Sequence, residues 1–426
     1  MATASSLVPP PTTRLAAPPA RAARPAARYL VAQGVGAFGL AAGGTSGGLL
    51  VADLTGRPAA AAWPVGVLAL GAALSAPVLT GIMHRAGRRV GLVVGYLAAA
   101  AGATGVLVGV AVRSLWLILA ASALLGAGNS AVMLTRYVLA DAVPPGARGR
   151  AVSRSLLVTV IGALVAPNLL QPTAELAAPL GLPEESGLYL VAMVVFAIAA
   201  VVLRPTFPAE PAVSTAPVSE AVPEAPNGLS PTPAAAGRTR LAVVVLTTAN
   251  AAMVSMMTVA TVHLQTHGHD LAAIGLAVSL HVGGMFLPSP LAGQLCDRLG
   301  AMPVALAGAA LLVVVGVTGA VQEPSGMAAT SGLLLLLGVS WNLQVVAGTV
   351  LLTEAVPPAQ RPVAEGRGEL LMGLAAGTAA LLGASPLAAV GGLQLLSAAV
   401  ALVGIATATM LAVRLAQPPR LRQPHR

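Results

Sequence analysis

Apolar residues dominate long stretches of the chain, and charged residues are confined to shorter segments between them. A helix needs about 20 mainly apolar residues to cross a bilayer, so each stretch free of Arg, Asp and Glu is a candidate span. Such stretches cover residues 29–52, 58–84, 90–112, 114–135, 155–174, 186–203, 241–269, 271–296, 299–322, 324–353 and 370–413. The last is too long for one crossing and is interrupted by glycines and Pro386, so it counts as two. The pattern predicts an all-α integral membrane protein with twelve transmembrane helices.

The polar segments divide the chain into two halves of six predicted helices each. We expect a disordered cytoplasmic tail at 1–28, a first half at 29–203, a cytoplasmic linker at 204–240, a second half at 241–415 and a cytoplasmic tail at 416–426. The linker is rich in Pro, Ala, Ser and Glu, a composition that buries little surface.

The composition agrees with lipid as the main solvent, because only 9% of the residues are charged and 56% are hydrophobic. All 23 basic residues are arginine. Without lysine the chain can form neither a P-loop nucleotide site nor a Schiff base. Its one cysteine, Cys296, leaves no disulfide and no CxxC site for zinc or redox chemistry.

The arginines also predict the orientation. Most of them lie in the tails, the linker and the loops on the same side, which the positive-inside rule makes cytoplasmic. The net charge of +9 is then explained by topology and by contact with anionic lipid headgroups, and not by nucleic acid. We expect a multi-pass protein of the plasma membrane with both termini in the cytoplasm.

The two halves are related by an internal repeat. Residues 141–148 (DAVPPGAR) and 354–361 (EAVPPAQR) nearly match, at an offset of 354 − 141 = 213. The same offset pairs Arg85 with Arg298, and Asn129 with Asn342. Two such halves form a pseudo-symmetric pair, and transporters built this way bind their solute near the midplane between the halves.

Two motifs resemble those of the major facilitator superfamily. Residues 293–300 (GQLCDRLG) are similar to the family's GxLxDRxG sequence between helices 8 and 9, and residues 80–89 (TGIMHRAGRR) are the first-half counterpart, with His84 in place of Asp. Gly162 and Pro167 fall in a segment similar to the helix-5 motif of the bacterial multidrug and small-solute exporters. The resemblance implies twelve helices, alternating access, and a cavity lined by helices 1, 4, 7 and 10.

The resemblance also implies a cytoplasmic charge network. Its candidate residues are Arg85, Gly87, Arg88, Arg89, Asp141, Arg148, Gly293, Asp297, Arg298, Gly300, Glu354 and Arg361. Our hypothesis is that Arg85 or Arg88 pairs with Asp141, and Arg298 with Glu354, which holds the cytoplasmic side closed. The alternative is that these charges only orient the protein and lie in solvated loops.

Polar residues within the helices that would line the cavity are candidate substrate contacts. They are Asn129, Asn250, Trp341, Asn342 and Gln344. Each can equally make a hydrogen bond between packed helices. Arg136 is costly in lipid, so it either extends toward the cytoplasm and pairs with Asp141, or faces the cavity and favours an anionic substrate.

Candidates for proton coupling are few, because no carboxylate is predicted at the centre of a span. They are Asp53, His281 and Glu369. For His281 the alternative is a structural hydrogen bond, and for Glu369 it is pairing with Arg367 or Arg154. His263, His267 and His269 could hold a metal ion, but we interpret them as a polar loop and expect neither a metal nor a cofactor.

We therefore expect a secondary active transporter of a small organic solute that works by alternating access as a proton-coupled exporter, and no enzyme activity. The expected partners are a small-molecule substrate, the lipid bilayer and protons, with the protein acting as a monomer. Two alternatives remain: a metabolite importer of the same fold, and a membrane sensor or assembly protein without transport.

Overall fold

The computed structural model describes residues 20–57, 60, 62–165, 169–204, 233–269, 271–322, 326–383 and 392–416. Most of the expected linker, the expected C-terminal tail from 417 onward, residues 1–19 of the expected N-terminal tail, and Pro167 lie outside these residues.

The first half holds six bilayer-length elements. They are α1 (Ala20–Thr55), α2 (Ala62–Ala86), α3 (Arg88–Ala111), α4 (Leu115–Asp141), α5 (Arg148–Val165) followed by the short α6 (Leu170–Ala177), and α7 (Gly187–Val202). The second half repeats this order with α8 (Pro233–Thr266), α9 (Leu271–Phe286) followed by α10 (Ser289–Leu299), α11 (Ala301–Gln322), α12 (Met327–Ala355), α13 (Arg361–Gly383) and α15 (Gly392–Ala416).

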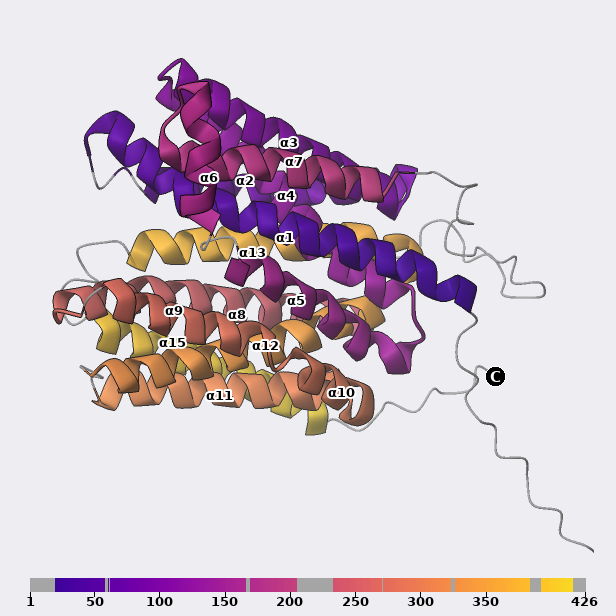
Figure 1. The fold of residues 1–426 in the computed structure, drawn as a ribbon. Coiled ribbons are helices and arrows are strands. Elements are labelled where there is room, and N and C mark those ends of the chain that lie inside the picture. The colour runs from indigo at the N-terminus through magenta and orange to yellow at the C-terminus, as the bar shows by residue number, and fades with distance from the viewer. Residues whose placement is uncertain are drawn as a thin grey trace, which may run out of the picture.

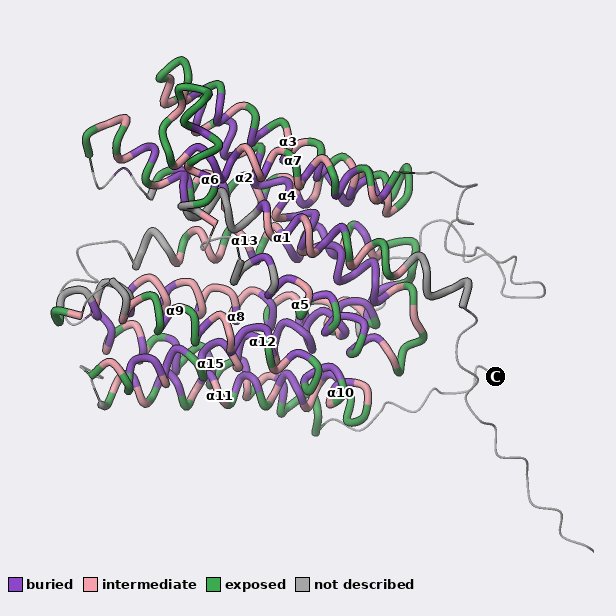
Figure 2. The backbone as a smooth tube through the Cα atoms, in the orientation of Figure 1, coloured by how far each residue is buried: buried purple, intermediate pink, exposed green. Residues whose placement is uncertain are grey.

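This architecture confirms the predicted all-α membrane fold. The described residues contain no strand, and nine of their helical segments are long and apolar enough to cross a bilayer. Figure 1 shows the two halves as two groups of roughly parallel helices, with α13 of the second half lying between them. Figure 2 shows buried residues where helices face each other and exposed ones on the outer faces. Large apolar side chains such as Leu74 and Leu402 are exposed, as expected for a protein surrounded by lipid.

Two helices begin earlier than the sequence pattern predicted. α1 begins at Ala20 and α8 at Pro233, inside the expected tail and linker. Both starts are rich in alanine, the strongest helix former. Proline is also favoured in the first turn of a helix, where its missing N–H leaves no hydrogen bond unmade.

The predicted span 271–296 is broken, which the sequence pattern did not predict. α9 ends at Phe286 and α10 begins at Ser289. Pro288 and Pro290 lack the N–H groups that would continue the helical hydrogen bonds. The Asn342 side chain donates hydrogen bonds to the Met285 carbonyl (2.6 Å) and the Ser289 hydroxyl (2.7 Å), so the break has a specific partner on α12.

Candidate functional site

The turns after α2, α4, α10 and α12 lie together at one end of the bundle, which we call the arginine-rich end. The turn residues Gly87 and Gly300 are repeat mates with φ of 96° and 89°. Only glycine adopts this conformation readily, and each lets two helices meet with one residue between them.

One cluster of charges joins the two halves at this end. Arg88 at the start of α3 forms ion pairs with Asp141 of α4 and Glu365 of α13. Arg361 of α13 donates to the other Asp141 oxygen at 2.8 Å. Asp141 and Arg88 belong to the first half and their two partners to the second, so these bonds fasten α3 and α4 to α13.

A second connection uses the start of a helix. Asp297 of α10 accepts hydrogen bonds from the backbone N–H groups of Gly149 (2.8 Å) and Arg150 (3.2 Å) at the start of α5, and pairs with the Arg150 guanidinium at 3.3 Å. A carboxylate is favoured there because the first N–H groups of a helix are unpaired and its dipole is positive at that end.

The repeat explains why His84 replaces aspartate in the first half. The repeat mates of Gly149 and Arg150 are Pro362 and Val363. Proline has no N–H to donate, so an acidic residue at position 84 would lack one of its two backbone partners. The first half uses Arg88 and Glu365 instead, and the two connections between the halves are chemically different.

The structure brings together only part of the predicted charge network. The expected pair of Arg298 with Glu354 is wrong: both side chains are exposed, and neither has an ion pair among the described residues. Arg85 is also exposed. Arg89 instead donates to the Leu203 carbonyl at the end of α7, and Arg148 is buried, with no hydrogen-bond partner for its Nε among the described residues.

We expect Asp141→Asn to loosen the arginine-rich end and Glu354→Gln, its repeat mate, to leave it intact. The first change removes the charge that holds Arg88 and Arg361, at a cost of about 1.5–3 kcal/mol for each hydrogen bond to a charged group. Cys296 serves as the reporter, since it is the chain's one cysteine, is 5% exposed and lies at the α5–α10 contact beside Gly149. Its rate of maleimide labelling should rise in Asp141→Asn alone; equal rates in the two variants would contradict this assignment.

A buried ion pair lies deeper between the halves. Arg136 of α4 pairs with Glu369 of α13, and its Nε donates to the Thr349 hydroxyl of α12 at 3.1 Å. Tyr137 donates its hydroxyl hydrogen to Glu369 at 3.2 Å, and Arg136 also bonds the Met133 carbonyl at 3.0 Å. The side chain of Arg136 is 0% exposed, so this network is the charged centre of the interface between the halves.

These contacts correct two expectations. Arg136 does not extend to Asp141, and Glu369 does not pair with Arg367 or Arg154, both of which are exposed. Tyr137 and Thr349 were not among the residues predicted from the sequence. The internal repeat carried a signal for Thr349, because 136 + 213 = 349 makes it the repeat mate of Arg136.

Asn129 remains the strongest candidate for a solute contact. It lies seven residues before Arg136 on α4, which places both on one face about 10 Å apart. Its side chain is half-buried and makes no hydrogen bond with any described residue. A free amide inside a membrane helix is stable only next to water or another polar group, so this position is suited to a ligand.

Asn250 and Trp341 form one polar contact within the second half. The Trp341 indole donates to Asn250 at 3.1 Å, and Asn250 donates to the Met372 carbonyl of α13 at 3.2 Å. Trp341 is buried and packs edge-on against Phe286, with ring centroids 5.8 Å apart. Asn250 is half-buried, so of the two it is the one open to a solute.

Asn342 and Gln344 do not line the interface between the halves, contrary to expectation. Asn342 bonds the α9–α10 break, as described above. Gln344 donates to the Ser340 hydroxyl at 3.1 Å and packs on Gly308 of α11. Both side chains are fully buried among the helices of the second half, so their contacts are structural.

The remaining candidates are spread over the molecule. His281 is buried and its Nδ1 lies 2.8 Å from the Leu334 carbonyl of α12, whereas Asp53 is exposed near the end of α1. The rings of His263 and His267 lie 4.0 Å apart. No group of three His, Cys, Asp or Glu residues within the described ranges is placed to hold a metal ion.

Gly162 packs directly on the α1 backbone, where an added Cβ would lie 2.5 Å from the Ala37 carbonyl carbon.

A buried polar cluster that the sequence analysis missed joins α1 and α5. Ser155 donates to the Gln33 side-chain oxygen at 2.7 Å, and Gln33 donates to the Thr159 hydroxyl at 3.3 Å. The signal was the amide in the first span together with two hydroxyls four residues apart in the fifth.

The halves separate with distance from the arginine-rich end. A Cβ added at Gly366 of α13 would overlap the Thr80 hydroxyl of α2, at Gly373 it would lie 2.7 Å from Ala73, and at Gly377 3.9 Å from Leu70. The backbones of Gly149 and Gly293 also touch at the arginine-rich end. The structure is therefore closed at that end, and α2 and α13 diverge toward the other.

Two six-helix halves that meet at a buried charged centre, and close at one end, define a polytopic transporter. The family model of the Major Facilitator Superfamily matches residues 29–366. The chain belongs to this superfamily of membrane transporters.

Individual relatives agree with this assignment. The chain is 32% identical over 349 residues to the uncharacterized MFS-type transporter YdeG of Bacillus subtilis, covering 81% of each protein. It is 27% identical over 334 residues to the riboflavin transporter RfnT of Brucella anthropi, covering 76% of this chain and 79% of that one. Its fold is similar to the crystal structure of the Escherichia coli fucose:proton symporter FucP, with a TM-score of 0.69 at 13% identity, covering 93% of this chain and 100% of the other.

Proposed function

We propose that this protein exports a small organic solute by alternating access, in exchange for protons, with Glu369 as the proton-carrying group. The observation that carries the proposal is the buried pair of Arg136 and Glu369 across the two halves. Protonating Glu369 neutralises one member of the pair and leaves Arg136 free to attract an anionic group of the solute.

The surrounding groups support this role. Thr349 and Tyr137 keep hydrogen bonds to Arg136 and Glu369, so the loss of the ion pair does not leave every polar group unsatisfied. Asn129 stands about two helical turns away on the same face, where it can bind a second polar group of the solute. Export is favoured by the likeness of the segment around Gly162 to the exporter motif.

The orientation and assembly belong to the same proposal. The arginine-rich end faces the cytoplasm of a plasma membrane, since positive loops are retained on that side, and one chain contains both halves of the pathway. The structure then corresponds to the state closed toward the cytoplasm, with Arg88, Asp297 and their partners as the cytoplasmic gate.

Flux measurements on purified protein in liposomes test the proposal. A panel of small carboxylates, with riboflavin included because of the relative that carries this name, is loaded on either side under a pH gradient of either sign. We expect the solute to move across the membrane in the direction opposite to the flow of protons. Movement along the gradient would identify a symporter and importer, and binding without flux would identify a sensor.

We expect Asn129→Ala to weaken solute binding and Asn342→Ala, its repeat mate, to weaken the fold. Asn129 has no partner among the described residues, so its loss should raise the KM for the solute about two- to ten-fold, the value of one hydrogen bond, with an unchanged unfolding temperature. Asn342 holds the α9–α10 break, so its loss should lower the unfolding temperature. Thermal unfolding with and without solute separates the two effects, and a lower unfolding temperature in Asn129→Ala would argue for packing at both positions.

A further inference from the structure

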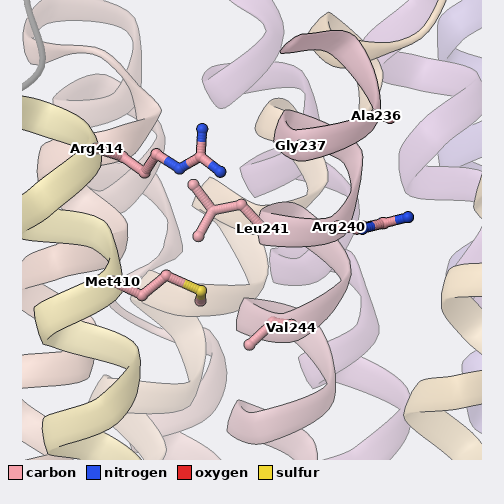
Figure 3. Close-up of a pocket in the computed structure, with 7 residues that line it drawn as sticks. All are labelled: Ala236, Gly237, Arg240, Leu241, Val244, Met410 and Arg414. Carbon is pink, nitrogen blue, oxygen red and sulfur yellow. The ribbon is translucent and has the colours of Figure 1, made fainter. Parts of the chain in front are cut away.

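The outer surface of the second half carries a pocket of about 430 Å³ between α8 and α15 at the arginine-rich end, shown in Figure 3. It lies outside the interface between the halves. Its apolar wall is formed by Leu241 and Val244 of α8 and Met410 of α15. Val244 is exposed and Met410 half-buried, so the wall continues directly into the lipid-facing surface of the two helices.

Two cations stand at the polar side of this pocket. Arg414 reaches from α15 across the pocket toward Gly237, and Arg240 extends from α8 in the direction away from α15 (Figure 3). A Cβ added at Gly237 would lie 3.4 Å from the Arg414 guanidinium, so the glycine leaves room for it. Both arginines are exposed, and neither has an ion-pair partner within the part of the chain that the structure describes.

The arginines lie about one helical turn closer to the helix ends than Val244 and Met410 do. Arg414 follows Met410 by four residues, and Arg240 precedes Val244 by four, which corresponds to about 6 Å along each helix. A ligand that fills the pocket therefore meets positive charge at the arginine-rich end and apolar side chains toward the membrane interior. An anionic headgroup attached to an acyl chain has this distribution of charge, whereas a free phosphate has no apolar part that would contact the wall.

The second half alone carries these two charges. The repeat mates of Arg240 and Arg414 are Ala27 and Val201. In the corresponding pair of helices, α1 and α7, Gly39 lies so close to Phe196 that an added Cβ would come within 2.8 Å of the ring. At that contact α1 and α7 pack tightly against each other.

We propose that this pocket binds one anionic phospholipid, with the phosphate at Arg414, an acyl chain along Leu241, Val244 and Met410, and Arg240 adding positive charge from the far side of α8. Arg414 makes the larger contribution, because its guanidinium lies over the pocket. The site binds a lipid from the leaflet at the arginine-rich end. Lipid binding at this site does not depend on the solute that the protein moves.

Lipid-dependent thermal unfolding of the full-length protein in detergent tests this proposal. The ligands are phosphatidylglycerol, phosphatidylcholine with the same acyl chains, and inorganic phosphate. Phosphatidylglycerol should stabilise the wild-type protein at lower concentrations than phosphatidylcholine. Arg414→Gln should raise the phosphatidylglycerol concentration that gives half of the maximal stabilisation (the midpoint) about five-fold, which is the contribution of one arginine near an anionic surface. Arg240→Gln should raise this midpoint less.

Two further variants separate a specific site from general attraction. Gly237→Leu fills the pocket but keeps both arginines, so it should reproduce the loss seen in Arg414→Gln. Arg204→Gln removes an exposed arginine from the end of α7 in the other half and should leave the midpoint unchanged.

The proposal is overturned if Gly237→Leu behaves like the wild type, or if Arg204→Gln loses as much affinity as Arg414→Gln. Equal effects of the two lipids would also overturn it, and inorganic phosphate that reproduces the stabilisation would show a phosphate site instead. A wild-type protein whose unfolding temperature does not respond to phosphatidylglycerol would equally exclude it.

Discussion

Glu369→Gln abolishes proton-driven transport in the mechanism proposed above, because glutamine cannot release or take up the proton that breaks the bond to Arg136. Flux in liposomes under a pH gradient should fall to the level of empty liposomes. The same change leaves a buried guanidinium without its counter-charge, which costs about 3–5 kcal/mol of stability. The unfolding temperature should therefore fall together with transport.

A double variant separates these two effects. Arg136→Met combined with Glu369→Leu replaces the buried pair by apolar side chains, a change that is often neutral or stabilising in other proteins. We expect it to recover the unfolding temperature and to remain inactive. Glu184→Gln, at an exposed carboxylate before α7, is the matched control and should transport normally. Normal proton-driven flux in Glu369→Gln would overturn the role assigned to this residue.

Gly293→Val should hold the arginine-rich end open and stop the transport cycle. A Cβ at this position would overlap both the Ser153 hydroxyl and the Gly149 carbonyl, so α10 can no longer approach α5 as it does in the closed state. Maleimide labelling of Cys296 should accelerate, and solute flux should be lost, while the helices themselves stay folded. Both effects follow from the overlap of one added side chain with α5, which makes this the largest expected change outside the charged centre.

The control for this experiment is Gly332→Val on α12, where an added Cβ meets no atom within 4 Å. It introduces the same side chain into a helix of the same half and should change neither labelling nor flux. Unchanged Cys296 labelling in Gly293→Val, with the protein still folded, would show that the α5–α10 contact is not what protects the cysteine.

The fold was predictable because a helix that spans a bilayer requires a long apolar segment. Each helix must present about 20 apolar residues, so the positions of the charges mark the spans. The break between α9 and α10 was not predictable in the same way. Prolines are tolerated within membrane helices when neighbours satisfy the freed carbonyl groups, and only the structure shows that Asn342 takes this role at the Met285 carbonyl.

The candidate site was predictable in its members but not in its pairings. Arg136 and Glu369 both stood out as charges in apolar surroundings, yet the partners considered were Asp141 for Arg136, and Arg367 or Arg154 for Glu369. Their separation of 233 residues is bridged only when the two halves pack, with α4 against α13. The residue types therefore indicated a charged centre, and the packing decided which charges meet.

The contact between Arg136 and Thr349 has a consequence for the origin of the charged centre. Two repeat mates can touch only at the twofold axis that relates their halves. If the two halves were separate, identical chains, each Arg136 would face a second arginine at this point, and every carboxylate would also occur twice. One arginine, one threonine and one glutamate around the axis require two sequences free to diverge while remaining side by side. Fusion of the halves into a single chain provides that freedom, so an ancestral dimer of half-length subunits could not have held this single ion pair on its axis.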